Sequence, residues 1–155
     1  LAFDFGEKMG LNNYELNRLS LLATLHDIGK TTIPENVLKK PAELKDNEWE
    51  LIKKHPERGF KIAAASEEFA AIADEIRSHH EKWDGSGYPD GLEKEEIPYL
   101  ARIITIIDSY DVMTNDRPYS KAISKKEALL EIEGCAGSQF DPELAEKFVG
   151  FTKSK

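Results

Sequence analysis

The chain contains little cysteine: Cys135 is the only one among 155 residues, so no internal disulfide can form. A lone cysteine fits a reducing compartment, and we predict a cytoplasmic protein. Cys135 lies between Gly134 and Gly137 and far along the chain from the histidines, so we interpret it as a small buried residue. No apolar run approaches the ~18 residues of a membrane helix, and no charged-then-apolar leader opens the chain, which predicts no membrane segment and no secretion signal.

Basic residues are also fewer than acidic ones. The chain has 21 lysines and arginines against 29 aspartates and glutamates, a formal charge of -8. Nonspecific binding to a nucleic-acid backbone depends on clustered basic residues, so we expect no nucleic-acid polymer as a partner. A small anionic ligand is compatible with this charge if local cations or metal ions hold it. Strand signals are absent as well: no segment alternates with strand period and no internal repeat occurs, so we predict one all-α domain.

Apolar residues recur at helical spacing along most of the chain. Helices are predicted over 1–9, 13–27, 35–38, 46–55, 57–65, 66–81 and 99–113, with two more beginning at Ser124 and at Asp141. Residues 31–34 are predicted to form an extended turn. The 99–113 helix is apolar on nearly every side and is expected to be central. Residues 82–98 hold three glycines and two prolines. Since this stretch exceeds the ~12–15 residues of an ordinary loop, it is predicted to be a functional loop and not a simple connection.

His26 and Asp27 stand side by side at the end of a predicted helix, which Ile28 and Gly29 are expected to stop. Neighbouring residues of a helix point about 100° apart, which suits two groups that each reach a different metal ion, or one ion from two sides. Lys30 follows at the helix end, where a cation can meet a phosphate or the negative end of the helix dipole. From the residues alone, a solvated cation is the other interpretation of Lys30.

All four histidines lie at predicted helix ends or junctions: His26, His55, His79 and His80. Imidazole and carboxylate ligands without thiolate suit iron, manganese, nickel or zinc, and six or more such groups exceed what one ion needs. We therefore predict a site with at least two metal ions, an arrangement that can activate water and clamp a phosphorus centre during in-line displacement. A further ligand is expected from the apolar 99–113 helix, where Asp108 and Asp111 are both candidates because a carboxylate there needs a metal, a cation or several donors.

Eight short segments, spread over most of the chain, carry a more specific signal: His26-Asp27-Ile28-Gly29-Lys30, His55-Pro56-Glu57, His79-His80-Glu81, Asp84-Gly85-Ser86-Gly87-Tyr88-Pro89, Ala101-Arg102-Ile103, Asp108-Ser109-Tyr110-Asp111, Arg117-Pro118-Tyr119 and Phe140-Asp141-Pro142. In combination they resemble the HD-GYP branch of the HD superfamily of metal-dependent phosphohydrolases. The resemblance implies an all-helical HD-domain bundle with the Gly/Pro loop beside the metal site. It also implies two or three divalent metal ions, most often iron or manganese, and hydrolysis of the bacterial second messenger cyclic di-GMP.

The same resemblance implies roles for individual residues. The positions that match metal ligands are His26, Asp27, His55, His79, His80 and Asp108, which selects Asp108 over Asp111. Lys30 matches a lysine near a substrate phosphate and is expected, with Asp27, to act in catalysis. Gly87, Tyr88 and Pro89 match the loop beside the pocket, and Arg117 matches a residue that helps to hold the nucleotide.

Two departures from the family pattern matter. The family carries a further histidine ligand, and in trinuclear members a glutamate, on the helix before the doublet, but no histidine precedes His26. We favour a chain that starts within that helix over a protein that has lost the ligand. Residues 1–155 are then an HD-GYP domain without its first helix or helices, inactive or weaker in metal affinity. The family often has a basic residue directly after Arg-Pro-Tyr, whereas here Ser120 holds that place, and Lys121, the next residue, is the candidate substrate contact.

We therefore predict a metal-dependent phosphodiesterase in which a metal-activated bridging hydroxide opens cyclic di-GMP to linear pGpG, or on to GMP. Family members are usually outputs of bacterial signalling proteins, so an upstream sensor or receiver domain is expected as a partner. Two alternatives stay open. One is a noncatalytic module that binds cyclic di-GMP or docks a protein, and the other is an HD phosphohydrolase for another nucleotide.

Overall fold

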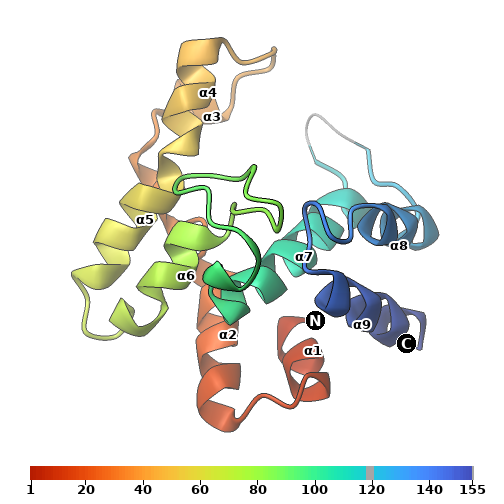
Figure 1. Ribbon diagram of the computed structural model, residues 1–155. Coiled ribbons are helices and arrows are strands. Elements are labelled where there is room, and N and C mark those ends of the chain that lie inside the picture. Colours follow the sequence, from red (N-terminus) through yellow and green to blue (C-terminus); the bar gives the residue numbers. More distant parts are fainter. Residues whose placement is uncertain (118–120, 155) are drawn as a thin grey trace.

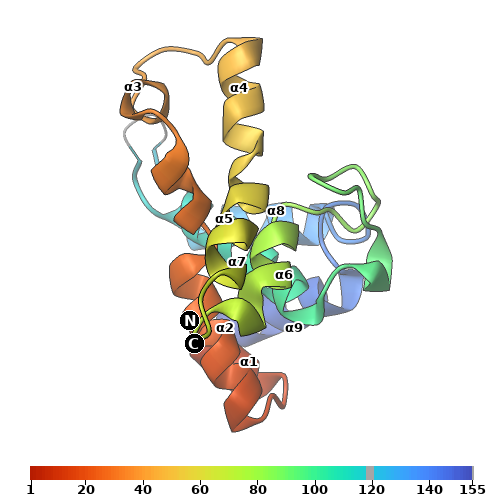
Figure 2. The same ribbon diagram turned by 90° about the vertical axis from the view of Figure 1, so that its left-hand side faces the viewer.

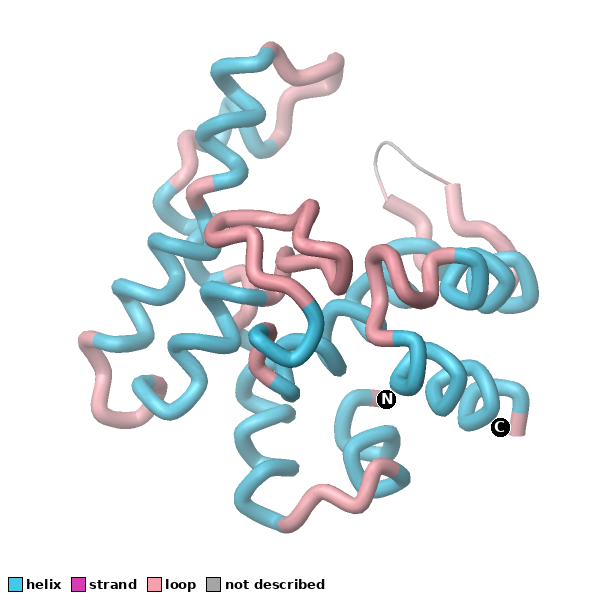
Figure 3. Tube along the Cα trace, viewed as in Figure 1, coloured by secondary structure: helices cyan, strands magenta, loops and turns pink. Residues whose placement is uncertain are grey.

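The computed structural model describes residues 1–117 and 121–154, and their secondary structure is helical (Figures 1 and 3). Nine α-helices occur there: α1 (Ala2–Lys8), α2 (Asn13–Leu25), α3 (Glu35–Leu38), α4 (Asp46–Lys53), α5 (His55–Ala64), α6 (Ala73–Ser78), α7 (Tyr99–Thr114), α8 (Lys125–Gly134) and α9 (Pro142–Lys153). Three short 3-10 helices join them: η1 (Ile28–Thr32), η2 (Ala70–Ile72) and η3 (Lys94–Glu96). Elsewhere this part of the chain has isolated β-bridges and no strand, which confirms the predicted all-α class. Among these described helices, none combines the length and the apolar character that crossing a bilayer requires.

Helix α7 is central, as its composition predicts. Its buried residues are Leu100, Ala101, Ile103, Ile104, Ile106, Ile107 and Tyr110. Helices α2, α6, α8 and α9 all pack against it, and Figure 1 shows it running between α6 on one side and α8 and α9 on the other. Full burial of each aliphatic side chain stabilises the fold by roughly 1.5–3 kcal/mol. Asp108 interrupts this apolar helix and is only half-buried, so its place calls for a functional explanation.

The first and last helices pack together. Phe5 is fully buried, with its ring centroid 5.1 Å from that of Phe148 and 5.4 Å from that of Phe151. Between α1 and α2, the side chains of Asn12 and Glu15 each accept the other residue's backbone N–H, which is a capping box. These contacts hold α2, with the histidine at its end, against the core.

Several predicted helix bounds were wrong. Helix α2 ends at Leu25, two residues before the predicted end, because the chain tightens there into η1. The single helix predicted over 66–81 is divided into η2 and α6. The division falls at Ile72 (φ −118°, ψ 8°), which leaves helical geometry while its side chain is fully buried. Helix α6 therefore ends directly before His79, which is its C-cap residue.

The segment after α2 is also tighter than predicted. Residues 31 and 32 belong to η1 and not to an extended turn, because the hydroxyls of Thr31 and Thr32 donate to the carbonyls of Ile28 and Gly29, each at 2.8 Å. Gly29 does not stop a helix: it lies inside η1 and its φ is not positive. Its role is close packing, since a Cβ at Gly29 would lie 1.9 Å from the backbone oxygen of His55. The bare backbone lets η1 lie directly on α5.

Helices α3 and α4 project from the rest of the fold, at the top of both views (Figures 1 and 2). Helix α4 ends at Lys53, and α5 begins at His55 with Pro56 in its first turn. A junction next to His55-Pro56 is therefore confirmed, but His55, predicted as the last residue of the 46–55 helix, is the first residue of α5. Proline is accepted there because the first N–H groups of a helix have no partner within the helix.

Candidate metal centre

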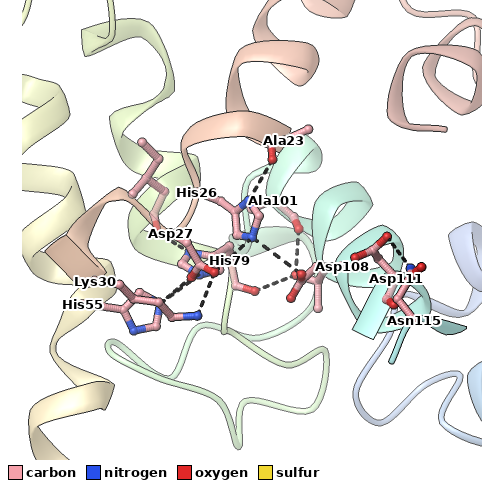
Figure 4. Close-up of polar contacts among 12 residues, drawn as sticks. Ala23, His26, Asp27, Lys30, His55, His79, Ala101, Asp108, Asp111 and Asn115 are labelled. Atoms are coloured by element: carbon pink, nitrogen blue, oxygen red, sulfur yellow. Dashed lines mark hydrogen bonds and ion pairs between the residues drawn. The ribbon is translucent and has the colours of Figure 1, made fainter. Parts of the chain in front are cut away.

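Six side chains carried by five elements meet in one region. Figure 4 labels all of them except His80. His26 ends α2, Asp27 precedes η1, His55 begins α5, His79 and His80 follow α6, and Asp108 lies on α7. One potential ligand atom from each of Asp27, His55, His79 and His80 lies within 4.8 Å of the others. Helix-end positions that are far apart in the sequence are thus brought to one point by the packing of α5, α6 and η1.

His26 links this cluster to the central helix. Its Nε2 atom is 3.6 Å from Asp27 Oδ2 and 3.6 Å from Asp108 Oδ1, and Figure 4 shows the ring between the two carboxylates. Its Nδ1 atom is 3.1 Å from the carbonyl oxygen of Ala23. Asp111, one turn further along α7, is exposed and lies away from the cluster (Figure 4). Of the two candidate carboxylates on α7, the structure puts Asp108 in contact with the cluster.

Two buried histidines face each other at the centre of the cluster. The Nδ1 atom of His55 (1% exposed) is 2.7 Å from the carbonyl oxygen of Ile52, and that of His79 (3% exposed) is 2.6 Å from the carbonyl oxygen of Ile76. A carbonyl oxygen can only accept, so both Nδ1 atoms carry hydrogen, and in a neutral imidazole of this tautomer the lone pair lies on Nε2. These Nε2 atoms are 3.2 Å apart, and that of His55 is 3.2 Å from Asp27 Oδ1. A proton or a metal ion among these three atoms would satisfy them together.

This donor set fits a divalent metal ion. His26 Nε2 and Asp27 Oδ1 are buried and have no hydrogen-bond partner among the described residues. Imidazole nitrogen and carboxylate oxygen are common ligands of divalent metals. Backbone carbonyls that hold the second ring nitrogen are the usual outer contacts of metal-binding histidines. The assignment of individual ligands stays a prediction.

Burial and neighbouring charges keep most of the cluster in the forms that bind metal. Burial lowers the pKa of His79, and burial together with the nearby His79 and His55 lowers the pKa of His80 to about 3. Burial alone would raise the pKa of the Asp27 carboxyl, but contacts with His55, His79 and Lys30 hold it well below its ordinary value. Metal ligands must be neutral imidazoles or ionised carboxylates, so these groups are ready near neutral pH.

His26 behaves differently from the other histidines. Burial lowers its pKa, but the carboxylates of Asp108 and Asp27 outweigh burial and raise the pKa above its ordinary value. Burial opposes ionisation of Asp108 too, yet contact with His26 lowers the pKa of that carboxyl. A metal ion bound at His26 must therefore displace a proton that is held more tightly than on a free imidazole.

The loop of residues 84–92 lies directly on the second histidine of the pair. The ring of Tyr88 stacks on that of His80, with centroids 5.0 Å apart and an interplanar angle of 20°, and the Tyr88 N–H donates to the His80 carbonyl at 3.2 Å. Gly87 permits this approach, because a Cβ there would lie 2.6 Å from the same carbonyl oxygen. Burial, followed by the charge of Asp27, raises the pKa of Tyr88 to about 12, so its phenol stays uncharged.

Glu81, to which the His79-His80-Glu81 segment gave no individual role, anchors this loop. Its side chain is almost fully buried, and its carboxylate accepts the N–H groups of Asp90 (2.7 Å), Gly91 (3.2 Å) and Leu92 (3.1 Å). Arg77 of α6 adds two hydrogen bonds to the Asp90 carboxylate, at 2.6 and 2.7 Å. The available signal was the position of Glu81 directly after the histidine pair.

Glu81→Gln is expected to destabilise the protein by about 1–3 kcal/mol, because an amide has one acceptor oxygen and turns an NH2 donor toward a buried N–H. Chemical denaturation measures the loss, and faster hydrogen exchange at amides 90–92 locates it. Glu96→Gln is the control, since that carboxylate accepts an exposed N–H from Glu93. Unchanged exchange at 90–92 in the Glu81 variant would contradict the anchoring role.

The predicted substrate-binding residues do not all lie at the cluster. Lys30 Nζ donates to Asp27 Oδ2 at 2.7 Å, and 37% of its side chain is exposed, so it lies at the edge of the cluster. Arg117 is outside the cluster: it is exposed, with Nη2 3.5 Å from Asp111 Oδ2. Lys121 is exposed in the segment that leads to α8. The other residues of this motif lie outside the described residues: Pro118, Tyr119 and Ser120.

A cavity of about 390 Å³ adjoins the cluster. Its lining includes His80, Tyr88 and Asp108, and also Glu131 and Cys135 of the α8 region. Cys135 is partly exposed there, so its interpretation as a buried residue remote from the histidines was wrong. The reason is that α8 packs against α7 and so brings residue 135 beside the helix that carries Asp108.

Fold and site together define an all-helical protein with a candidate divalent-metal centre at its helix ends. Residues 1–144 match the HD domain family, and the chain belongs to that family. It is 40% identical over 155 residues to a cyclic di-GMP phosphodiesterase of Thermotoga maritima, a match that covers 99% of this chain and 42% of the relative. It is 39% identical over 142 residues to the cyclic di-GMP phosphodiesterase response regulator RpfG of Xanthomonas campestris, covering 90% of this chain and 38% of that protein.

A solved structure shares the fold across nearly the whole chain. A cyclic GMP-AMP specific phosphodiesterase of Vibrio cholerae aligns with a TM-score of 0.75 at 25% identity, covering 98% of this chain and 42% of that one. These comparisons confirm the predicted resemblance and the HD-domain fold. The chain spans about two fifths of the length of these relatives.

Proposed function

We propose that this domain is a metal-dependent phosphodiesterase that opens cyclic di-GMP to linear pGpG, or on to GMP. The observation that carries the proposal is the convergence of the Nε2 atoms of His55 and His79 on Asp27, beside a cavity of the size that small ligands occupy. The names of the Thermotoga and Xanthomonas relatives support cyclic di-GMP as the substrate.

Metal binding is assigned to the six side chains of the cluster: His26, Asp27, His55, His79, His80 and Asp108. Ligands of this number and type exceed the need of one ion, and two or three divalent ions of iron or manganese are proposed. When bound, such ions supply an activated water and neutralise charge on the phosphoryl oxygens.

Lys30 is assigned to a phosphoryl oxygen of the substrate. An ammonium has three donors, and one of them is used by the carboxylate of Asp27 at 2.7 Å. The partly exposed side chain can therefore donate to a phosphate while Asp27 keeps it oriented, which stabilises negative charge in the transition state. Gly87, Tyr88 and Pro89 form the loop that borders the substrate, because Tyr88 is held against the cluster.

Residues 1–155 are proposed to be the output domain of a bacterial signalling protein that works in the cytoplasm, joined to a sensor or receiver domain. Two observations support this. The chain spans only about two fifths of its curated relatives, and one of them is named a response regulator.

The test is metal content and turnover measured on the same sample. The full-length protein is purified without chelator and without oxygen, analysed for metals, and assayed for cyclic di-GMP hydrolysis by chromatography. Two or more ions per chain with formation of pGpG are expected. Tight binding of cyclic di-GMP without hydrolysis in the metal-loaded protein would support a noncatalytic module, and turnover of a different nucleotide would support another HD phosphohydrolase.

Arg117→Ala is expected to raise the KM for cyclic di-GMP about tenfold with unchanged metal content, because a charged hydrogen bond to substrate is lost while the cluster is untouched. The long 3.5 Å contact with Asp111 leaves this exposed guanidinium available to a ligand. Steady-state kinetics and elemental analysis measure the two quantities. Lys126→Ala removes an exposed cation from α8 as the control. Metal loss in the Arg117 variant would contradict the role.

A further inference from the structure

The cavity beside the cluster is also lined by residues to which no function has been assigned above. On α7 it is lined by Asp108 and, one turn further, by Val112 and Met113. On the facing side it is lined by Glu131 of α8 and by Cys135, one turn apart. A ligand held at the metal cluster can therefore extend into a space bounded by α8.

This part of the cavity combines apolar surface with opposite charges. Val112 and Met113 supply the apolar surface, while Lys82 and Glu131 are lining residues of opposite charge, and both charges act on the Cys135 thiol. The thiol of Cys135 is 3.6 Å from Glu131 Oε1, a weak donation that leaves the carboxylate able to accept stronger donors. Burial, followed by the charge of Glu131, raises the pKa of the Cys135 thiol, so it stays uncharged. A flat heterocycle with donors on one edge matches this lining.

The two purines differ at the edge that such a lining would contact. Guanine presents a carbonyl acceptor together with ring N–H and amino donors, whereas adenine presents an amino donor beside an unprotonated ring nitrogen. A carboxylate can accept from both guanine donors, but it would face the lone pair of adenine N1. We propose that Glu131 binds the guanine edge of the substrate and sets a preference for guanine over adenine, with Lys82 as the donor to the carbonyl oxygen. The proposal rests on the proposed function for the kind of substrate.

Glu131→Gln tests this assignment in the metal-loaded, full-length protein. Values of kcat/KM are compared for cyclic di-GMP, 3'3'-cGAMP and cyclic di-AMP, and calorimetry compares the binding of GMP and AMP. The substitution is expected to reduce the preference for guanine over adenine by about tenfold or more, because a bidentate contact to the base is lost and the new NH2 group can donate to adenine N1. Glu131 is exposed on α8, so unchanged thermal unfolding is expected.

Glu133→Gln is the matched control on the same helix. Its carboxylate is exposed, pairs with Lys153 at 2.9 Å and lines a different cavity, so the base preference should not change. An unchanged preference in Glu131→Gln, an equal loss for guanine and adenine nucleotides, or a wild-type protein that binds GMP and AMP equally would each overturn the assignment. Failure of the proposed function is distinguishable, because absent hydrolysis of cyclic di-GMP leaves the comparison of GMP with AMP intact.

Discussion

Asp27→Ala is expected to remove bound metal and phosphodiesterase activity together. Asp27 Oδ1 lies 3.2 Å from His55 Nε2 and 3.7 Å from His79 Nε2, so the substitution takes away the negative charge that these buried nitrogens share. Loss of residues that merely orient metal ligands costs roughly 10–100-fold in affinity or activity, so a loss of at least about a hundredfold is expected for a ligand. Metal titration, elemental analysis and turnover of cyclic di-GMP measure these effects.

Asp74→Ala is the matched control for that prediction. Asp74 is an exposed carboxylate on α6, the helix that ends directly before His79, and its removal should leave metal content and turnover unchanged. Chemical denaturation of both metal-free variants separates loss of ligand from loss of fold. Normal metal content in Asp27→Ala would refute the ligand assignment, whether or not activity is lost.

Elements away from the site were predictable because their signals are short-range. The helices predicted from residue 13 and from Ser124 begin there as α2 and α8, because Asn12 with Glu15 and Ser124 with Glu127 each form a capping box. Asp141 caps α9 as predicted, accepting N–H groups two and three residues ahead. In each case the deciding hydrogen bonds join residues no more than three positions apart, so the local sequence contains all the information.

Near the metal cluster, the local structure is decided by contacts between residues far apart in the sequence. Predictions from neighbouring residues alone were therefore wrong there. Gly29 was interpreted as a helix stop, but it serves the approach of η1 to His55, 26 positions later in the chain. The histidine set could be predicted because imidazoles at several helix ends are unusual in a core. Glu131 and Cys135 carry no such local signal, since they reach the cavity only through the packing of α8 on α7.

Gly29→Ala is expected to weaken metal binding although it changes no candidate ligand. The added Cβ would lie 1.9 Å from the carbonyl oxygen of His55 and 2.7 Å from the backbone nitrogen of Gly59. Both obstacles are backbone atoms of α5 and cannot turn aside as a side chain can, so η1 and α5 must separate. Asp27 is attached to η1 and His55 to α5, so their ligand atoms move apart. Overpacking of this kind costs about 1–3 kcal/mol or more in the free energy of unfolding.

A shift of about 1 Å between catalytic groups can reduce turnover about a hundredfold, so activity should fall further than stability. Denaturation of the metal-free protein, metal titration and kinetics together measure the three effects. Gly134→Ala is the matched control: its added Cβ would meet open space, and alanine favours the helix that Gly134 ends. A Gly29→Ala protein with wild-type stability and metal affinity would show that the contact of η1 with α5 does not position Asp27 against His55.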